Sequence, residues 1–143
     1  MRAILVTLLL AALTGCTIYG DKKPPTLKST SSAEQYERIL WKTVQEKRWV
    51  QVPGLLSNNL MYSTSGKVLG KDQTISYLQS ENITGVSITN MVVKPNGPDM
   101  TLNYTLQLSV ASGPPQTLTA VSVWQQVGSD WILIAHMEQP ATS

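Results

Sequence analysis

The chain has 143 residues, a length that fits one domain of ordinary size. Apolar residues make up 42% of it and charged residues 14%, so the chain can build a core and is too apolar for an intrinsically disordered protein. The formal charge of +2 is small and the sequence contains no basic cluster, which argues against a nucleic-acid partner.

The first residues predict an export signal with a lipid attachment site. Arg2 precedes an apolar run, residues 3–13, that is too short to span a bilayer comfortably. The run leads into Leu13-Thr14-Gly15-Cys16, which resembles the lipobox of bacterial lipoproteins. The resemblance implies that residues 1–15 are a signal peptide, cleaved before Cys16, and that Cys16 carries lipid such as palmitate. The alternative is an ordinary signal peptide that contains a cysteine by chance.

Cys16 is the only cysteine, so the chain has no internal disulfide and no cysteine-based metal site. Residues 16–31 are polar and contain prolines, serines and threonines, which predicts a lipidated Cys16 followed by a flexible tether. Thr17 stands where an Asp would signal retention in the inner membrane in enteric-type sorting. We therefore expect a protein of the bacterial cell envelope, held by its lipid at the outer membrane and facing the periplasm.

Residues 31–49 have the strongest helical pattern in the chain. One side is an apolar stripe, the other is mostly polar, and Trp41 lies off the stripe, where we expect it to pack against another element. The helix is expected to end before Pro53, because proline disfavours helix at the preceding residue. The stripe contains Tyr36, Leu40, Val44 and Lys47, and the polar side contains Glu37, Gln45, Glu46 and Arg48.

The rest of the chain is mostly strand-like. We expect a short strand near residues 60–64, a turn at Ser65-Gly66 and a second short helix over residues 71–80. Further strands are predicted over residues 86–94, 100–110, 117–127 and 131–140, the last three joined by hairpin turns. Helices followed by an antiparallel sheet give the α+β class.

This order resembles the nuclear transport factor 2-like superfamily, especially its SnoaL-like members. The residues that carry the likeness are the first helix with Trp41, the segment "VPGLLSNNLMYSTSGKVLGKDQTISYL" and the paired strands ending "SVWQQVGSDWILIAHMEQP". The likeness covers residues 32–140, which we take as the domain. It implies a cone in which N-terminal helices pack on a curved antiparallel sheet around a pocket, and a sheet face that related domains use to form homodimers.

Enzymes of this superfamily, such as ketosteroid isomerase and scytalone dehydratase, keep acids, tyrosines or a histidine in that pocket. This chain departs from the pattern. It has Asn58 and Asn59 where members often carry Asp, and an amide cannot act as a general base. The strand over residues 100–110 contains no acid. No catalytic set transfers residue by residue, which weighs against an enzyme.

The last strand holds His136, the only histidine. Strict alternation predicts that His136 points into the cone with Glu138 on the same side. His136 is then either a catalytic group oriented by Glu138 or a structural histidine. No metal is expected, because zinc needs about three protein ligands and the chain has no second histidine. Alternation places Ile132, Ile134, His136 and Glu138 on one face, and Trp131, Leu133, Ala135 and Met137 on the other.

The residues that we consider for ligand binding come from four predicted elements. Tyr36 and Tyr104 have hydroxyls that suit a ligand oxygen, although both also suit a core. Trp124 and Trp131 flank the last hairpin and either line a pocket or pack in the core or at an interface. No cofactor is expected. The full set of ligand-binding candidates is Tyr36, Asn103, Tyr104, Trp124 and His136.

Three functions remain open from the sequence. The first is a non-catalytic envelope domain that binds a small apolar ligand in the cone or a protein on the sheet. The second is a SnoaL-like isomerase or dehydratase that uses His136 with Tyr36 or Tyr104. The third is a purely structural envelope component. The enzyme requires His136 in an open pocket within reach of Glu138 or a tyrosine, and a fully packed His136 contradicts it. A filled cone would leave the sheet face and favour a protein partner.

Overall fold

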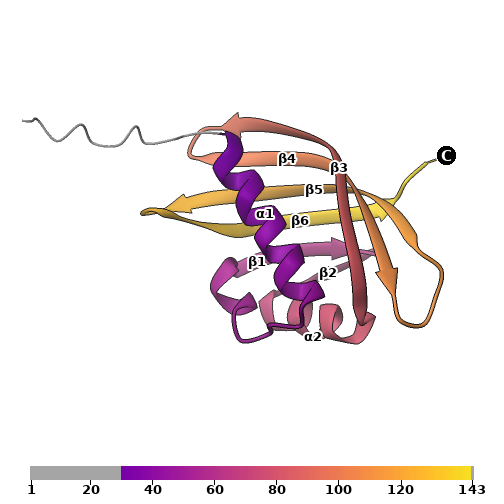
Figure 1. Ribbon diagram of the computed structural model, residues 1–143. Helices are drawn as coiled ribbons and strands as arrows, with labels where there is room; N and C mark the ends of the chain where they lie inside the picture. The colour runs from indigo at the N-terminus through magenta and orange to yellow at the C-terminus, as the bar shows by residue number, and fades with distance from the viewer. Residues whose placement is uncertain (1–29, 143) are drawn as a thin grey trace, which may run out of the picture.

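The structure is a computed structural model and describes residues 30–142, in which one long helix lies across a curved sheet (Figure 1). The signal peptide, Cys16 and most of the predicted tether lie outside the described residues. No helix in residues 30–142 is long and apolar enough to cross a membrane. The helices are α1 (Thr30–Gln45), the 3-10 turn η1 (Val52–Leu55) and α2 (Lys71–Glu81). The strands are β1 (Leu56–Thr64), β2 (Lys67–Leu69), β3 (Ile83–Asn96), β4 (Asp99–Val110), β5 (Gln116–Val127) and β6 (Asp130–Pro140).

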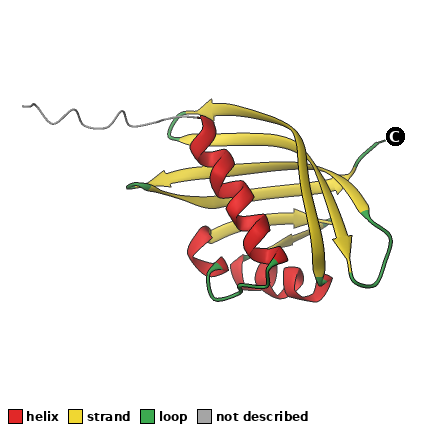
Figure 2. Ribbon diagram, viewed as in Figure 1, coloured by secondary structure: helices red, strands yellow, loops and turns green. Residues whose placement is uncertain are grey.

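The strands form one sheet in the order β2-β1-β6-β5-β4-β3, shown in yellow in Figure 2. Strands β3 to β6 pair antiparallel through successive hairpins, as the turns predicted. Strand β1 runs parallel to β6, with Tyr62 opposite His136, and this pairing was not predicted. The α+β class is therefore confirmed, and the parallel pairing brings the first strand beside the last.

Two turns show how local chemistry shapes the chain. The predicted turn at Ser65-Gly66 joins β1 to β2, and both residues have positive φ, of 47° and 75°, as tight hairpins require. Helix α1 ends at Gln45, four residues before the predicted end at residue 49. The reason is Lys47, whose φ of 57° is left-handed and whose Nζ donates to Asn82 Oδ1 over 2.6 Å.

The core lies between α1 and the inner face of the sheet. The alternation predicted for β4 is confirmed: residues 100, 102, 104, 106 and 108 are buried, and Asn103, Gln107 and Ser109 are exposed. Trp41 is buried in this layer, as expected for a side chain that packs against another element. Polar side chains that point from the inner face of the sheet are therefore buried in this core.

Strand β6 breaks the alternation that the sequence predicted. Val123 of β5 pairs with Ala135, but the next residue, Trp124, pairs with Leu133, so Ile134 is an extra residue in a β-bulge. The bulge turns Trp131 and Leu133 to the same face as His136 and Glu138, and all four are buried. The prediction that Trp131 and Leu133 lie opposite His136 was wrong, because a bulge shifts the alternation by one residue.

Candidate functional site

A carboxylate occupies the centre of the buried layer. Glu37 of α1 is 0% exposed and accepts hydrogen bonds from three donors on three elements. The Trp41 indole Nε1 donates to Oε1 over 2.8 Å, and the Tyr104 hydroxyl donates to the same oxygen. The Trp124 indole Nε1 donates to Oε2 over 2.5 Å. Charge-assisted bonds of this kind are what a buried carboxylate requires.

Glu37 was predicted to lie on the polar side of the helix, away from the apolar stripe, but it is buried in the core. Helical periodicity reports the apolar stripe but not a polar side chain that finds partners in the core. The residue types of the predicted core did indicate that a buried acceptor was needed. Trp41, Tyr104 and Trp124 are donors that need an acceptor when buried, and no acceptor had been assigned to them.

A second buried cluster surrounds His136. Its Nδ1 lies 2.9 Å from Ser122 Oγ, and its Nε2 lies 3.2 Å from Glu138 Oε2. With a proton on Nε2 the ring donates to Glu138, and Nδ1 pairs with the Ser122 hydroxyl. The ring stacks on Tyr62 at 4.5 Å between centroids, and Trp41 meets its edge at 5.9 Å.

Glu138 is held as an anion by donors around it. The Tyr62 hydroxyl donates to Oε2 over 2.8 Å and the Tyr77 hydroxyl to Oε1 over 3.4 Å. Burial acts to raise the pKa of Glu138, but the hydrogen bond and charge interaction with His136, helped by bonds from Thr64 and Tyr62, outweigh burial and lower that pKa. Glu138 therefore acts as an acceptor rather than as a proton donor.

The tyrosines of both clusters stay protonated at neutral pH. Burial, with the nearby Glu138 carboxylate, raises the pKa of Tyr62 well above 10. Burial, with the Glu37 carboxylate, does the same for Tyr104. Burial is also the main reason that the pKa of Tyr77 rises to about 12. Each phenol is thus a fixed hydrogen-bond donor and none is a base.

The two clusters join into one network that crosses the cone. Tyr104 OH lies 3.4 Å from Ser122 Oγ, which connects the Glu37 cluster to the His136 cluster. The network contains two carboxylates, a histidine and several tyrosines; His136, Glu138 and Tyr104 were expected in the cone, whereas Glu37 and Tyr62 were not. The side chain of His136 is nevertheless only 1% exposed. The side chains of the network are buried in the interior that a substrate would have to enter.

An apolar groove of about 340 Å³ lies on the opposite, outer face of the sheet. It crosses four adjacent strands in two rows, as the strand register shows. Met61, Val68 and Met137 are 62%, 64% and 50% exposed. His136 borders this groove too, although its side chain is turned into the cone. One row is Val121, Met137, Ser63 and Val68, and the other is Val123, Ala135 and Met61.

No family model matches this chain, and no curated protein matches it either. Solved structures do resemble it. A nuclear transport factor 2 (NTF2)-like protein from Cytophaga hutchinsonii is 16% identical, with 79% of this chain and 98% of that chain covered and a TM-score of 0.71. The domain has an NTF2-like fold. This confirms the fold class that the sequence predicted.

Two other structural neighbours are described as proteins of different kinds. A candidate dehydratase of the NTF2-like family from Streptomyces avermitilis is 14% identical, with 80% of this chain and 96% of that chain covered and a TM-score of 0.70. The CaMKII hub of S. rosetta is 13% identical, with 78% and 95% covered and a TM-score of 0.66. An NTF2-like fold therefore does not specify the function, which has to be argued from this chain's own residues.

Within the NTF2-like cone, the structure brings together three of the five ligand-binding candidates: Tyr104, Trp124 and His136. Tyr36 lies apart from His136, because its hydroxyl donates to Asp130 Oδ1 over 3.0 Å at the β5–β6 turn. Asn103 is exposed on the outer face, and that placement removes it from the cone. Neither tyrosine named beside His136 as a catalytic partner contacts it directly, whereas Tyr62, which was not named, stacks on it.

The structure also locates the other residues that the sequence singled out. Asn58 and Asn59 are exposed on β1, and Asn58 Oδ1 accepts a hydrogen bond from Lys71 Nζ over 3.1 Å. They therefore lie outside the cone. Trp131 is buried in the core. Within residues 30–142, no group of three or more His, Cys, Asp or Glu side chains is arranged to hold a metal ion.

Proposed function

We propose that this protein is an envelope-anchored interaction domain in which two copies pair through the outer face of the sheet. The observation that carries the proposal is the apolar groove over β2, β1, β6 and β5, together with the burial of Glu37, His136 and Glu138 among their partners in the cone. Their burial leaves little room for a ligand beside them. The outer groove is then the surface best suited to recognition.

The chemistry of the groove favours burial against a similar surface. Its side chains are valines, methionines, an alanine and one serine, and none that faces outward carries a charge. A contact between two copies would remove the exposed methionine and valine side chains of the groove from water. Methionine side chains adapt their shape to a partner. The same patch on two copies would make a twofold, self-complementary contact, which is the commonest symmetry of soluble oligomers.

The anchor in this proposal rests on the motif at residues 13–16, which supports lipid on Cys16 and residence at the outer membrane, facing the periplasm. Several acyl chains on one residue hold a protein firmly, since each buried methylene contributes about 0.8 kcal/mol. A polar tether over residues 16–31 would let the domain turn freely at the membrane surface. Two copies can then meet face to face.

The test is the oligomeric state in solution. We expect the chain from residue 16 onward, with Cys16→Ser, to sediment as a dimer, and its Met61→Lys/Met137→Lys variant to sediment as a monomer. In a symmetric dimer the double variant would bury four like charges in one contact. The free-energy cost of burying these charges exceeds what the remaining apolar side chains gain by burial. Sedimentation velocity over a concentration series measures both states.

A matched control is Val92→Lys/Val127→Lys. These valines are 50% and 51% exposed, similar to Met137, and neither borders the groove. The control is expected to remain a dimer. A monomeric parent chain at the highest soluble concentration, or equal dissociation of both double variants, would contradict pairing through this face.

A second candidate is an enzyme of the isomerase or dehydratase type that uses His136 with a tyrosine. One observation favours it: His136 is hydrogen-bonded between Ser122 and Glu138 and stacked on Tyr62, as a general base with an orienting carboxylate would be. It would need α1 or α2 to move, because the His136 side chain is buried. The chemical accessibility of His136 separates this candidate from the first.

A further inference from the structure

A second groove lies between α1 and β3, on the other side of the sheet from the proposed pairing face. It has a volume of about 320 Å³, at the lower end of the range for small-molecule sites. We propose that it binds a small amphipathic organic acid, a single carboxylate carried on a flat apolar body. The inference does not depend on how the outer face is used.

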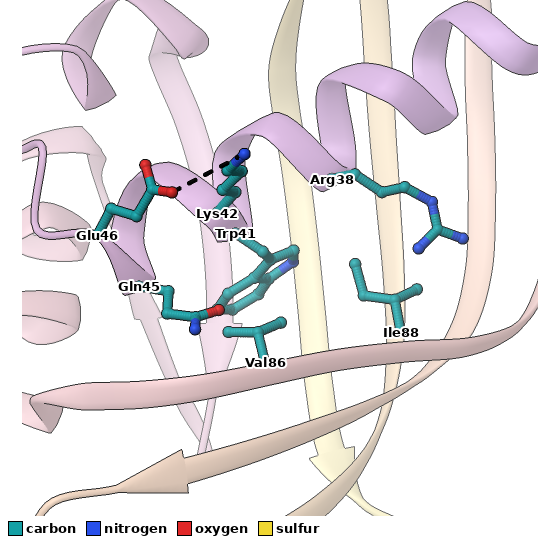
Figure 3. A pocket seen from close by; sticks show the side chains of 7 residues that line it. All are labelled: Arg38, Trp41, Lys42, Gln45, Glu46, Val86 and Ile88. Carbon is teal, nitrogen blue, oxygen red and sulfur yellow. Dashed lines mark ion pairs between the residues drawn. The ribbon is translucent and has the colours of Figure 1, made fainter.

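The floor of this groove is apolar and aromatic. Figure 3 shows the ring of Trp41 between α1 and Val86 of β3, with Ile88 farther along the strand. The indole Nε1 of Trp41 is already committed to Glu37 and Tyr104, over 2.8 and 3.0 Å. The indole is therefore fixed in place, and its hydrocarbon part borders the groove. A flat ring could lie over this floor, against Val86, Ile88 and the accessible edge of the indole.

The rim of the groove has an excess of positive charge. Arg38 pairs with Glu34 at 2.8 Å, and Glu46 is shared by Arg48 at 2.7 Å and Lys42 at 3.9 Å. Three surface cations thus share two surface carboxylates, so the solvent-exposed rim carries one more positive than negative charge, while Glu37 lies buried beneath Trp41. That balance suits one carboxylate and disfavours a cationic ligand.

Lys42 is the group best placed to receive the carboxylate. Its contact with Glu46 is long, because Arg48 takes the other oxygen of Glu46 at a much shorter distance. Lys42 borders the groove, and its side chain is 68% exposed, so its ammonium group can reach a ligand at little cost in desolvation. Arg38 adds a second donor, since bonds from Nε and Nη2 to Glu34 use only part of its guanidinium.

The test uses 1-naphthoate and its uncharged counterpart 1-naphthamide as probes. They are titrated into the ¹⁵N-labelled chain from residue 16 with Cys16→Ser. The four tryptophans give four indole N–H signals, and Trp41→Phe identifies the one from Trp41. We expect 1-naphthoate to shift the Trp41 indole signal and the amide signals of Val86 and Ile88. 1-Naphthamide should bind about fivefold more weakly, since it lacks the charge that a surface ion pair rewards.

Lys42→Glu is expected to weaken 1-naphthoate binding about tenfold, because the rim then repels the carboxylate. The matched control is Lys94→Glu, the same charge change on an exposed residue of β3 outside the groove, which should leave binding unchanged. Four results would each overturn the proposal: equal binding of the two probes, no effect of Lys42→Glu, shifts centred on Met61 and Met137, or no shift at the solubility limit. None of these results bears on the oligomeric state that sedimentation measures. Ligand binding in this groove and pairing through the outer face can therefore be contradicted independently.

Discussion

Replacing Glu37 by leucine is expected to lower the free energy of unfolding by about 3–5 kcal/mol. The substitution leaves the indole N–H of Trp124 without an acceptor in the core, and it removes the charged acceptor of Trp41 and Tyr104, which keep only the weaker neutral contacts of Trp41 with Tyr104 and of Tyr104 with Ser122. Each buried donor left unsatisfied costs about 1–3 kcal/mol, and the added apolar contact of leucine offsets only part of that. A loss of this size is a large share of the total stability of a small domain, about 5–15 kcal/mol. Urea unfolding followed by circular dichroism measures it.

The matched control is Glu34→Leu, one turn earlier on α1. Glu34 is partly exposed and pairs with Arg38 at the surface over 2.8 Å, a contact worth about 0.5 kcal/mol at most in this helical spacing. The control should therefore unfold at nearly the same urea concentration as the parent chain. Equal losses for the two variants would mean that Glu37 does not hold the network together.

Trp124→Ala is expected to be similarly damaging, at about 3–5 kcal/mol. Trp124 is fully buried on β5, so its removal leaves a cavity beside Tyr36, whose ring centroid lies 6.0 Å away. It also leaves Oε2 of Glu37 without its indole donor. The measurement is again urea unfolding.

Trp124→Phe separates these two causes, because it keeps most of the ring volume and removes only the N–H donor. It should cost about 1–3 kcal/mol, less than Trp124→Ala. Combined with Glu37→Leu, it should cost clearly less than the sum of the two single losses, since both remove the same hydrogen bond. Strict additivity would contradict a shared interaction.

The sequence predicted the parts of this fold that depend on local pattern. The alternation over β4 and the turn at Ser65-Gly66 are set by near neighbours in the chain, and both were confirmed. The NTF2-like fold was implied by a resemblance in element order and in particular segments, and the solved structures confirm that fold.

The parts that failed depend on contacts between distant residues. The bulge at Ile134 follows from the register of β6 against β5 and is invisible to an alternation rule. The burial of Glu37 follows from donors that lie 67 and 87 residues away in the chain. The same limit explains why His136 was expected in the cone but its contact with Tyr62 of β1 was not.

The residues inside this cone therefore have the composition of an active site and the packing of a core. Glu37, His136 and Glu138 each have hydrogen-bond partners, and the partners fill the space around them. Satisfied polar networks of this kind make a core rigid and specific. We therefore propose that recognition uses surfaces outside the cone, the outer groove above all.

The most direct test of that account is the reaction of the native chain with diethyl pyrocarbonate, which acylates accessible histidines. His136 is the only histidine in the sequence, so the absorbance of acylated imidazole reports on this one side chain. With the side chain 1% exposed, we expect native protein to react much more slowly than the urea-unfolded chain, because acylation has to wait for local opening. Equally fast acylation of the native protein would show that the cone is open, contradict the account, and return the enzyme candidate to first place.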